Sequence, residues 1–459
     1  MSHDELEQEG HERLHRFLDE SAHHPVPDGF VSRVAPRPRW FGPAGRSFGT
    51  VMAFTAVAAV MTILLVSTAG TAGSRRAAVE PTSGQPITAS TSLVPQSAYE
   101  DTSYAQSNAI VRITADRSSL TVVPIAPSPY PGVNPSPSAA PVTLGSVTCP
   151  AAGDCWAVGG GDESFGGIVE HYDGITWSAV GQPASGVIAG FVSVSCARAD
   201  DCWAVGSTTG DIPEPALEHY SDGAWSSVQG PELSAGALSG VSCPDSSHCW
   251  AVGSVFAPTG GSQEPLLEAY DGSGWSVVSN AANLPAGEVE GATLNAIACV
   301  GEDDCWAVGS DTGGELIEHY DGTRWTVSPG PAVPRGAPAL LAISCAGTSA
   351  CWAVGGDLME HYDGTGWTLV SGAPSSAGSP GLVSVTCVGA GDCWAVGSLN
   401  TVVPGQIPTT SAVVEWWDGT AWTRLSWSSR LAGLRLQGVA CTGSGTCWAV
   451  GAVVGWESP

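Results

Sequence analysis

Reactive side chains are concentrated in residues 299–325, which read CVGEDDCWAVGSDTGGELIEHYDGTRW. Cys299 and Cys305 could form a redox pair or bind a metal ion. The Glu-His-Tyr-Asp run that begins at Glu318 could supply the two carboxylates of a glycosidase. A catalytic or metal site of this kind needs one asymmetric constellation, so the first question is whether the stretch is unique in the chain.

The stretch is one copy of an internal repeat. The phrase C-x5-C-W-A-V-G occurs seven times, and successive second cysteines are 42 to 56 residues apart. Six copies are followed by a Glu-led phrase such as EHYDGTRW. These phrases begin at Glu170, Glu218, Glu268, Glu318, Glu360 and Glu415. Because the same residue types recur in most copies, we expect them to hold each unit together and not to form one catalytic site.

Each copy predicts four short β strands. LNAIAC and ELIEHY alternate apolar and polar residues, CWAVG is rich in β-forming residues, and RWTVS follows an Asp-Gly turn. Glycine adopts positive φ without steric cost, which suits a tight hairpin. Four strands in about 40 to 50 residues, repeated along a chain, are typical of a propeller blade. The predicted fold class is all-β, with a seven-bladed β-propeller of four-stranded blades over residues 143–459.

Residues 143–459 resemble β-propellers of the Kelch and Asp-box (sialidase-like) kind. The resemblance lies in blade length and in turn-plus-Trp phrases such as DGTRW at Asp321. An Asp-box reads Ser/Thr-x-Asp-x-Gly-x-Thr-Trp, whereas Asp and Gly are adjacent here, and the double glycine of Kelch repeats does not recur regularly. The resemblance therefore implies the propeller architecture and does not carry over the chemistry of those families.

Composition limits the partners of the chain. The 459 residues carry a formal net charge of −28. A strongly acidic protein repels phosphate backbones, so we expect no nucleic acid to bind the main domain. No pattern in the propeller predicts a cofactor, a metal ion or a catalytic residue.

The fourteen cysteines form seven C-x5-C pairs. Redox and zinc-knuckle motifs need C-x2-C spacing with further ligands. Each pair instead flanks a short turn between two predicted strands, and facing positions on antiparallel strands lie within disulfide reach. We predict seven local disulfides, with free structural thiols as the alternative, and disulfides indicate an oxidising compartment. The pairs are Cys149–Cys155, Cys196–Cys202, Cys243–Cys249, Cys299–Cys305, Cys345–Cys351, Cys387–Cys393 and Cys441–Cys447.

An apolar segment precedes the repeats. Residues 47–73 include VMAFTAVAAVMTILLV and are about long enough to span a bilayer as one helix. Four arginines lie ahead of the span within residues 33–46 and two follow it, which places the N-terminus in the cytoplasm and the propeller outside the cell. We therefore predict a single-pass protein of the cell membrane. A cleaved signal peptide is the alternative.

The predicted cytoplasmic segment, residues 1–46, is partly helical by its apolar spacing. Its histidines are interpreted as part of a solvated helix face. PVPDGFVSRV faintly resembles the juxtamembrane part of membrane-bound anti-sigma factors, but their zinc-binding His-x3-Cys-x2-Cys is missing. A cytoplasmic protein partner for this segment stays an open alternative.

The segments between span and repeats have separate roles. Residues 74–108 are predicted to be a disordered stalk, and residues 125–142 a Pro-rich linker. The last repeat ends without a Glu-led phrase, so we predict that residues 109–124 form a hairpin that completes its blade. IVRITADRSSLTVVP aligns with LIEHYDGTRWTVSP, which places Asp116 on Asp321, Leu120 on Trp325 and Ile113 on Glu318.

The blades differ most in the connection between CWAVG and the Glu-led phrase. Variable loops on a rigid scaffold usually carry binding. We therefore predict a ligand face built by 207–217, 254–267, 311–317 and 398–414. Its candidate ligand contacts are Asp211, Glu214, Phe256, Gln263, Glu264, Asn400 and Gln406.

These observations predict a non-catalytic module that binds an extracellular glycan or protein ligand. A glycan-active enzyme, either a sialidase-like hydrolase or a lyase, is one alternative. A sialidase-type site would resemble three convergent arginines with a tyrosine nucleophile, and no such set is obvious in the repeats. A transmembrane sensor that signals through the N-terminal segment is the other alternative.

Overall fold

A computed structural model describes the repeat region and the hairpin ahead of it. The described residues all lie in the second of two compact units, Thr91–Pro459. Their regular structure is entirely β, and none of them forms a helix that could cross a membrane. The predicted span, cytoplasmic segment and Pro-rich linker lie outside the described residues. Those residues are 108–114, 116–123, 143–160, 167–180, 188–210, 212–233, 235–256, 263–279, 291–333, 336–373, 380–401, 409–426, 432–443 and 445–453.

The strands form antiparallel sheets in chain order. Five sheets have four strands, and an eight-stranded sheet joins two sets of four through one residue pair, Gly160↔Gly190. The eight-stranded sheet holds β3 (Thr143–Ala151), β4 (Asp154–Gly160), β5 (Gly167–Tyr172), β6 (Trp177–Ala179), β7 (Ile188–Arg198), β8 (Asp201–Thr208), β9 (Pro215–Ser221) and β10 (Ala224–Val228).

The four-stranded sheets repeat one pattern, which we call a blade. The first two are β11 (Gly236–Ser242), β12 (Cys249–Phe256), β13 (Gln263–Tyr270) and β14 (Trp275–Ser279), then β15 (Thr293–Gly301), β16 (Asp304–Ser310), β17 (Glu315–Tyr320) and β18 (Trp325–Val327). The next two are β19 (Ala342–Gly347), β20 (Ala350–Gly355), β21 (Leu358–Tyr362) and β22 (Trp367–Leu369), then β23 (Gly381–Gly389), β24 (Asp392–Thr401), β25 (Thr409–Trp417) and β26 (Trp422–Arg424).

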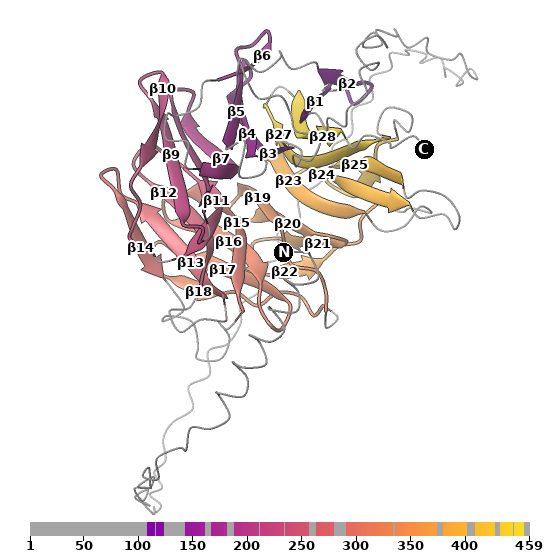
Figure 1. Ribbon diagram of the computed structural model, residues 1–459. Helices are drawn as coiled ribbons and strands as arrows, with labels where there is room; N and C mark the ends of the chain where they lie inside the picture. Colours follow the sequence, from indigo (N-terminus) through magenta and orange to yellow (C-terminus); the bar gives the residue numbers. More distant parts are fainter. Residues whose placement is uncertain are drawn as a thin grey trace, which may run out of the picture. The chain divides into compact units, whose positions relative to one another are not determined.

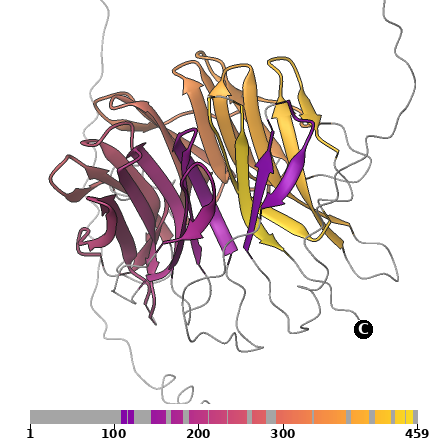
Figure 2. The same ribbon diagram turned by 90° about the horizontal axis from the view of Figure 1, so that it is seen from above.

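The first strand of each set lies at the centre of the molecule. Contacts run in cyclic order from β3 to β7, β11, β15, β19, β23 and β27 (Leu434–Cys441), and from β27 back to β3. Figure 1 shows these strands nearest to a common centre, with the sheets arranged around it. Figure 2 shows neighbouring sheets standing side by side. This closed arrangement of radial antiparallel sheets is a β-propeller.

The remaining sheet joins two distant parts of the chain. Its order is β2 (Leu120–Val123), β1 (Asn108–Ile113), β28 (Cys447–Val453) and β27. Strand β1 pairs with β28 from Asn108↔Ala452 to Ile113↔Cys447. The pairing covers an edge of β28 that would otherwise present free backbone groups.

The register in this sheet corrects the sequence alignment of Ile113. Ile113 pairs with Cys447, which is the relation of Tyr320 to Cys305 in the β15–β18 blade. The glutamate position is therefore taken by Val111, two residues earlier, and Val111 is fully buried. The error arose because the turn after Ile113 is two residues longer than the turn after Tyr320.

The cysteine prediction is confirmed. Seven disulfides join the predicted partners, and no free cysteine is present among the described residues. In the β15–β18 blade, Cys299 and Cys305 are facing residues of the β15–β16 pair. Because the two residues face each other across the strand pair, their side chains are close enough to form the disulfide.

Tryptophans pack one blade against the next, as their size predicts. The Trp250 ring lies 4.8 Å from the Tyr320 ring and 5.2 Å from the Trp325 ring, measured between centroids. The two tryptophan rings meet edge to face, which is favourable for aromatic pairs. Equivalent contacts join five further pairs of neighbouring blades, for example Trp306 with Trp367, whereas Trp394 packs in one cluster with Leu120. The rings therefore fix how the blades stack around the axis.

Candidate functional site

The turns between the first and second strands lie against the turns between the third and fourth strands. Gly322 has a φ of 84°, and a Cβ atom there would lie 3.0 Å from the Asp303 side chain. Gly174, with a φ of 90°, packs in the same way against Gly153. One edge of the blades is thus built from the same pair of close-packed turns, and we call it the uniform face.

The repeated aspartate of the Asp-Gly phrase holds its own turn. The Asp321 carboxylate accepts backbone N–H bonds from Thr323 and Arg324 at 2.9 and 3.0 Å. The Thr323 hydroxyl and these N–H groups lower the pKa of Asp321 to about 2. The same bonding recurs at Asp173, Asp271, Asp363 and Asp418. The structure confirms that this aspartate has a scaffold role.

The repeated histidine is also held within its blade. His319 Nε2 lies 2.9 Å from the Asp304 carboxylate, and the His319 ring stacks on Trp306 at 4.0 Å. Two other blades have the same histidine–aspartate pair, His171 with Asp154 and His219 with Asp201. This pairing was not predicted from the sequence. Its signal was present, because an aspartate before the second cysteine accompanies EHY in these three blades.

Each Glu-led phrase places its glutamate in the protein interior. The six glutamates are 0 to 5% exposed. Burial raises the pKa of Glu268 and of Glu318 to about 7. Glu415 differs, because the Arg424 guanidinium donates to its carboxylate at 2.8 Å. One buried glutamate at an equivalent place in each of six blades is a structural repeat and does not form a catalytic pair.

Three of the predicted ligand contacts, Phe256, Gln263 and Glu264, lie on the edge opposite the uniform face. Phe256 and Gln263 are partners at the outer ends of β12 and β13, and the Phe256 side chain is 44% exposed. Glu264 pairs with Val255 in the same ladder. These residues therefore form the end of the β12–β13 ladder that lies farthest from the disulfide. Asp211 and Gln406 lie outside the described residues.

The other candidates are placed on two further blades. Glu214 precedes β9, and its backbone bonds Thr208. Asn400 in β24 accepts a bond from the Thr410 hydroxyl at 2.8 Å. Within the described ranges, no hydrogen bond or ring contact joins candidates from different blades. The five described candidates therefore do not form one cluster.

A cavity does occur at one predicted segment, 311–317. Its volume is about 230 Å³, and we call it the Glu315 pocket. It lies where the connection between β16 and β17 meets the segment that leaves β18. Its lining comprises Asp311, Glu315, Leu316, Ile317, Val327, Ser328, Pro329 and Gly330. Its lining therefore combines two carboxylates with apolar residues.

The two acidic residues of the pocket have different tasks. Asp311 accepts the backbone N–H of Gly314 at 2.9 Å and so holds the connecting turn. Burial, with the Asp311 charge adding to it, raises the pKa of Glu315. A Cβ atom at Gly330 would lie 2.9 Å from Glu315 Oε1, so glycine there leaves room for the carboxylate. The predicted ligand face included the segment 311–317 but named neither acid as a contact, although the D-x-G-G turn ahead of Glu315 was a usable signal.

A second cavity, of about 190 Å³, lies on the axis between the first strands of the blades. Its serines link the blades: Ser146, Ser193 and Ser384 each accept a backbone N–H of the next first strand at 3.2 to 3.3 Å. These hydroxyls are engaged in ring closure, so this cavity is a weaker candidate for a ligand site.

Comparisons with known proteins concern the fold. No protein-family model and no curated protein matches the chain. YCF48 from Cyanidioschyzon merolae is 16% identical with a TM-score of 0.44, over 68% of this chain and 94% of that one. The GH74 xyloglucanase from Xanthomonas campestris is 13% identical with a TM-score of 0.48, over 68% of this chain and 51% of that one. The extracellular domain of the one-component system BT4673 from B. thetaiotaomicron is 12% identical with a TM-score of 0.45, over 69% and 38%.

Proposed function

We propose that the chain is a membrane-anchored, extracytoplasmic propeller of seven blades that acts as a non-catalytic binding module, with a glycan as its ligand. The blades are Kelch-like or Asp-box-like in architecture without the chemistry of those families. The observation that carries the binding role is the Glu315 pocket, which lies on the edge where the blades differ. A protein ligand on the same edge is the other outcome that the experiment below distinguishes.

The contrast between the two edges supports this assignment. On the uniform face, the aspartates of the Asp-Gly turns hold those turns, and His171, His219 and His319 pair with aspartates of their own blades. On the opposite edge, the connections vary in length and the side chains of Phe256 and Val327 are 44% and 41% exposed. Binding on variable loops held by a rigid scaffold is the common arrangement.

The chemistry of the pocket favours a sugar. Carboxylates such as Asp311 accept hydrogen bonds from hydroxyl groups. Glu315, with its raised pKa, can accept or donate depending on its protonation. Val327 and Pro329, which are exposed, provide apolar contacts for the C–H face of a sugar ring. Few polar groups placed over an apolar lining are typical of small-ligand sites.

The proposed location rests on the cysteines and the apolar segment together. Seven disulfides need an oxidising compartment. Residues 47–73 would anchor such a domain outside the cytoplasm, because four arginines precede this segment and only two follow it. The two signals are independent and agree.

One observation favours the enzymatic alternative. Burial, with the Glu315 charge adding to it, raises the pKa of Glu360 to about 8, and burial also raises the pKa of Glu315 itself. Glu360 is nevertheless fully buried and belongs to the repeated set. A group that cannot reach substrate cannot act as general acid, so binding is the better-supported function.

A glycan array probed with the purified full chain tests the proposal. We expect Glu315→Gln and Gly330→Leu to reduce binding to the selected glycan at least tenfold, the first by changing the polar partner and the second by filling the pocket. Asp222→Asn is the matched control, since Asp222 lies in a turn on the uniform face with a φ of 54° that asparagine tolerates. Equal binding by all three variants would remove the pocket from the function.

The same experiment separates the alternatives. Release of reducing sugar from a bound glycan, abolished by Glu315→Gln, would show an enzyme. Absence of binding to any glycan, with capture of a protein ligand that depends on Gly330, would show that the pocket serves a protein partner.

A further inference from the structure

The turn between β11 and β12 departs from the repeat in two linked ways. In three other blades, the residue before the second cysteine is an aspartate that bonds a third-strand histidine. Here that residue is His248, and Ala269 takes the third-strand position opposite Trp250. In this blade the histidine therefore lies in the turn and not on the third strand, so it does not form the histidine–aspartate pair of the other three blades.

In its new place, His248 meets carboxylates from two blades. Its Nδ1 lies 3.0 and 2.9 Å from the two Asp245 oxygens and 3.5 Å from Glu302 Oε2. Asp245 belongs to the same turn, whereas Glu302 lies in the β15–β16 turn of the next blade. One ligand atom from each residue can be chosen so that all three lie within 4.8 Å of one another. The three side chains are 46 to 56% exposed, so an ion can reach them.

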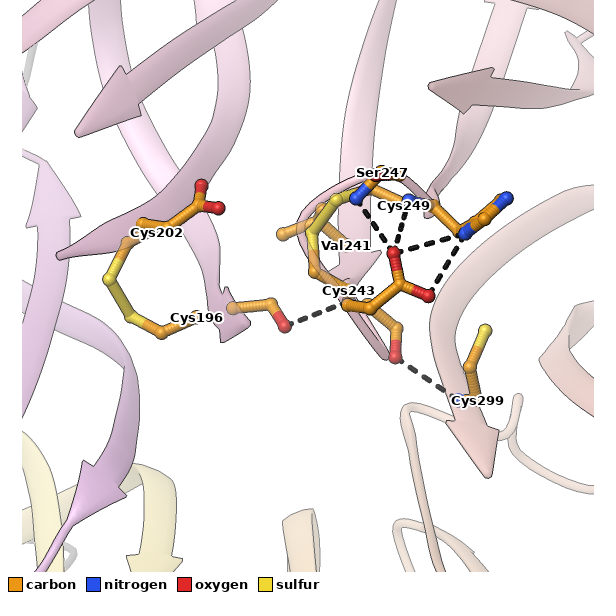
Figure 3. Close-up of a disulfide and its surroundings, with 12 residues drawn as sticks. Cys196, Cys202, Val241, Cys243, Ser247, Cys249 and Cys299 are labelled. Atoms are coloured by element: carbon orange, nitrogen blue, oxygen red, sulfur yellow. Dashed lines mark hydrogen bonds and ion pairs between the residues drawn. A yellow bond between two sulfur atoms is a disulfide. The ribbon is translucent and has the colours of Figure 1, made fainter. Parts of the chain in front are cut away.

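The backbone under this cluster is firmly held. Asp245 accepts the backbone N–H groups of Ser247 and His248 at 2.7 and 3.0 Å. The Cys243–Cys249 disulfide closes the turn, as Figure 3 shows, with Cys299 of the next blade close by. Ser242 accepts the backbone N–H of Cys299 at 3.1 Å and ties the two first strands together. Donors on a rigid base lose little freedom when a ligand binds.

We propose that Asp245, His248 and Glu302 form a binding site for a divalent transition-metal ion, with Zn²⁺ as the best match. One imidazole nitrogen and carboxylate oxygens are ligands that Zn²⁺ takes readily. Water would complete the coordination, since the site is open. The ion would join two neighbouring blades on the uniform face, away from the Glu315 pocket, so this inference does not depend on the proposed glycan binding.

Binding must compete with a proton. His248 can bind a metal through Nδ1 only after that nitrogen loses the proton it shares with Asp245. The Asp245 hydrogen bond, with the charges of Asp245, Glu302 and Asp303, raises the pKa of His248. Metal binding should therefore release a proton and weaken as the pH falls.

The test is equilibrium dialysis of the oxidised full chain against Zn²⁺ at pH 7.5. The background variant has glutamine at the N-terminal histidines His3, His11, His15, His23 and His24, so that only the propeller histidines stay. We expect one equivalent of bound Zn²⁺ and a loss of affinity of at least tenfold in His248→Gln and in Glu302→Gln. His319→Gln is the matched control and should bind like the background, because His319 pairs with Asp304 in the next blade.

Asp245 is left unchanged because it holds the turn, and thermal unfolding without metal checks that each variant folds. Zn²⁺ should raise the midpoint of the background and of His319→Gln, and it should leave the midpoint of His248→Gln unchanged. Equal Zn²⁺ affinity in His248→Gln and the background would overturn the proposal. So would the absence of binding at millimolar Zn²⁺, or a site that prefers Ca²⁺ and does not need His248.

Discussion

The guanidinium carbon of Arg117 lies 3.6 Å from the ring centre of Trp416. Arg117 belongs to the turn between β1 and β2, whereas Trp416 lies in β25 of the neighbouring blade. Trp416 takes the place of the repeated histidine and donates from Nε1 to the Asp392 carboxylate at 2.7 Å. The β1–β2 hairpin is therefore attached to β28 by backbone pairing and to the β23–β26 blade by a cation–π contact.

Loss of this contact should weaken the propeller slightly. We expect Arg117→Ala to lower the free energy of unfolding by about 0.5 to 1 kcal/mol, the usual size of an exposed cation–π interaction. Urea unfolding measures the change. Arg324→Ala is the control, since Arg324 lies in the equivalent turn of another blade and contacts no ring in the described structure. An equal loss in both variants would mean that the Trp416 contact contributes nothing.

Removal of the hairpin should have a much larger effect. A full chain without residues 100–124 loses β1 and β2. This deletion exposes the edge of β28 and the apolar side chains that pack against Val111 and Leu120 in the intact protein. We expect a markedly lower thermal midpoint or aggregation, measured by scanning calorimetry and light scattering. Removal of residues 77–99 is the control of similar length and should change little. Identical melting of the two truncated chains would argue against ring closure by this hairpin.

Single disulfides should contribute modestly. Replacement of Cys299 and Cys305 by alanine opens a short loop, and the chain-entropy model gives a loss of about 2 kcal/mol. The measurement is urea unfolding against the intact chain. The same double replacement at Cys387 and Cys393 should cost a similar amount, because the two blades share one register. A loss several times larger in either blade would show that the bridge also holds strained packing.

Much of the fold follows from repeat spacing, but the register at the ring closure does not. The strands, the disulfides and the stacking of Trp250 on the next blade could be predicted, because each depends on residues close in sequence or on a repeated type. The position of Ile113 was wrong because turn length is not fixed by the strands on either side. Only the pairing with Cys447 shows that Val111 replaces the buried glutamate.

The candidate sites were harder to predict, for a physical reason. The candidate contacts were chosen because their connections vary between blades, and this variation does not tell which segments meet in space. The Glu315 pocket needs the segment after β18, and the His248 cluster needs Glu302 from another blade. The His248 cluster depends on how neighbouring blades stack, and the Glu315 pocket depends on how the segment after β18 lies against Ile317. The pattern of the strands encodes neither.

The buried glutamates make stability depend on pH. Glu318 has a pKa of about 7 in the folded protein, against 4.5 without burial, so the folded state binds more protons than the unfolded state between these values. The resulting gain in the free energy of unfolding is complete below about pH 4.5 and is lost as the pH rises through about 7. The change is at most about 3 kcal/mol per glutamate. Urea unfolding of the full chain between pH 4.5 and 8 should show stability falling toward the alkaline end.

Glutamine substitutions test whether these glutamates are the cause. A glutamine side chain has the shape of the protonated acid and cannot ionise, so Glu318→Gln should unfold at higher urea than the parent at pH 8 and show little difference at pH 4.5. Glu415→Gln should do the opposite at pH 8, because Arg424 then keeps a buried charge without its carboxylate partner. If Glu318→Gln destabilised the chain equally at both pH values, the carboxylate would have a charged partner in the folded state, and burial alone would not explain its role.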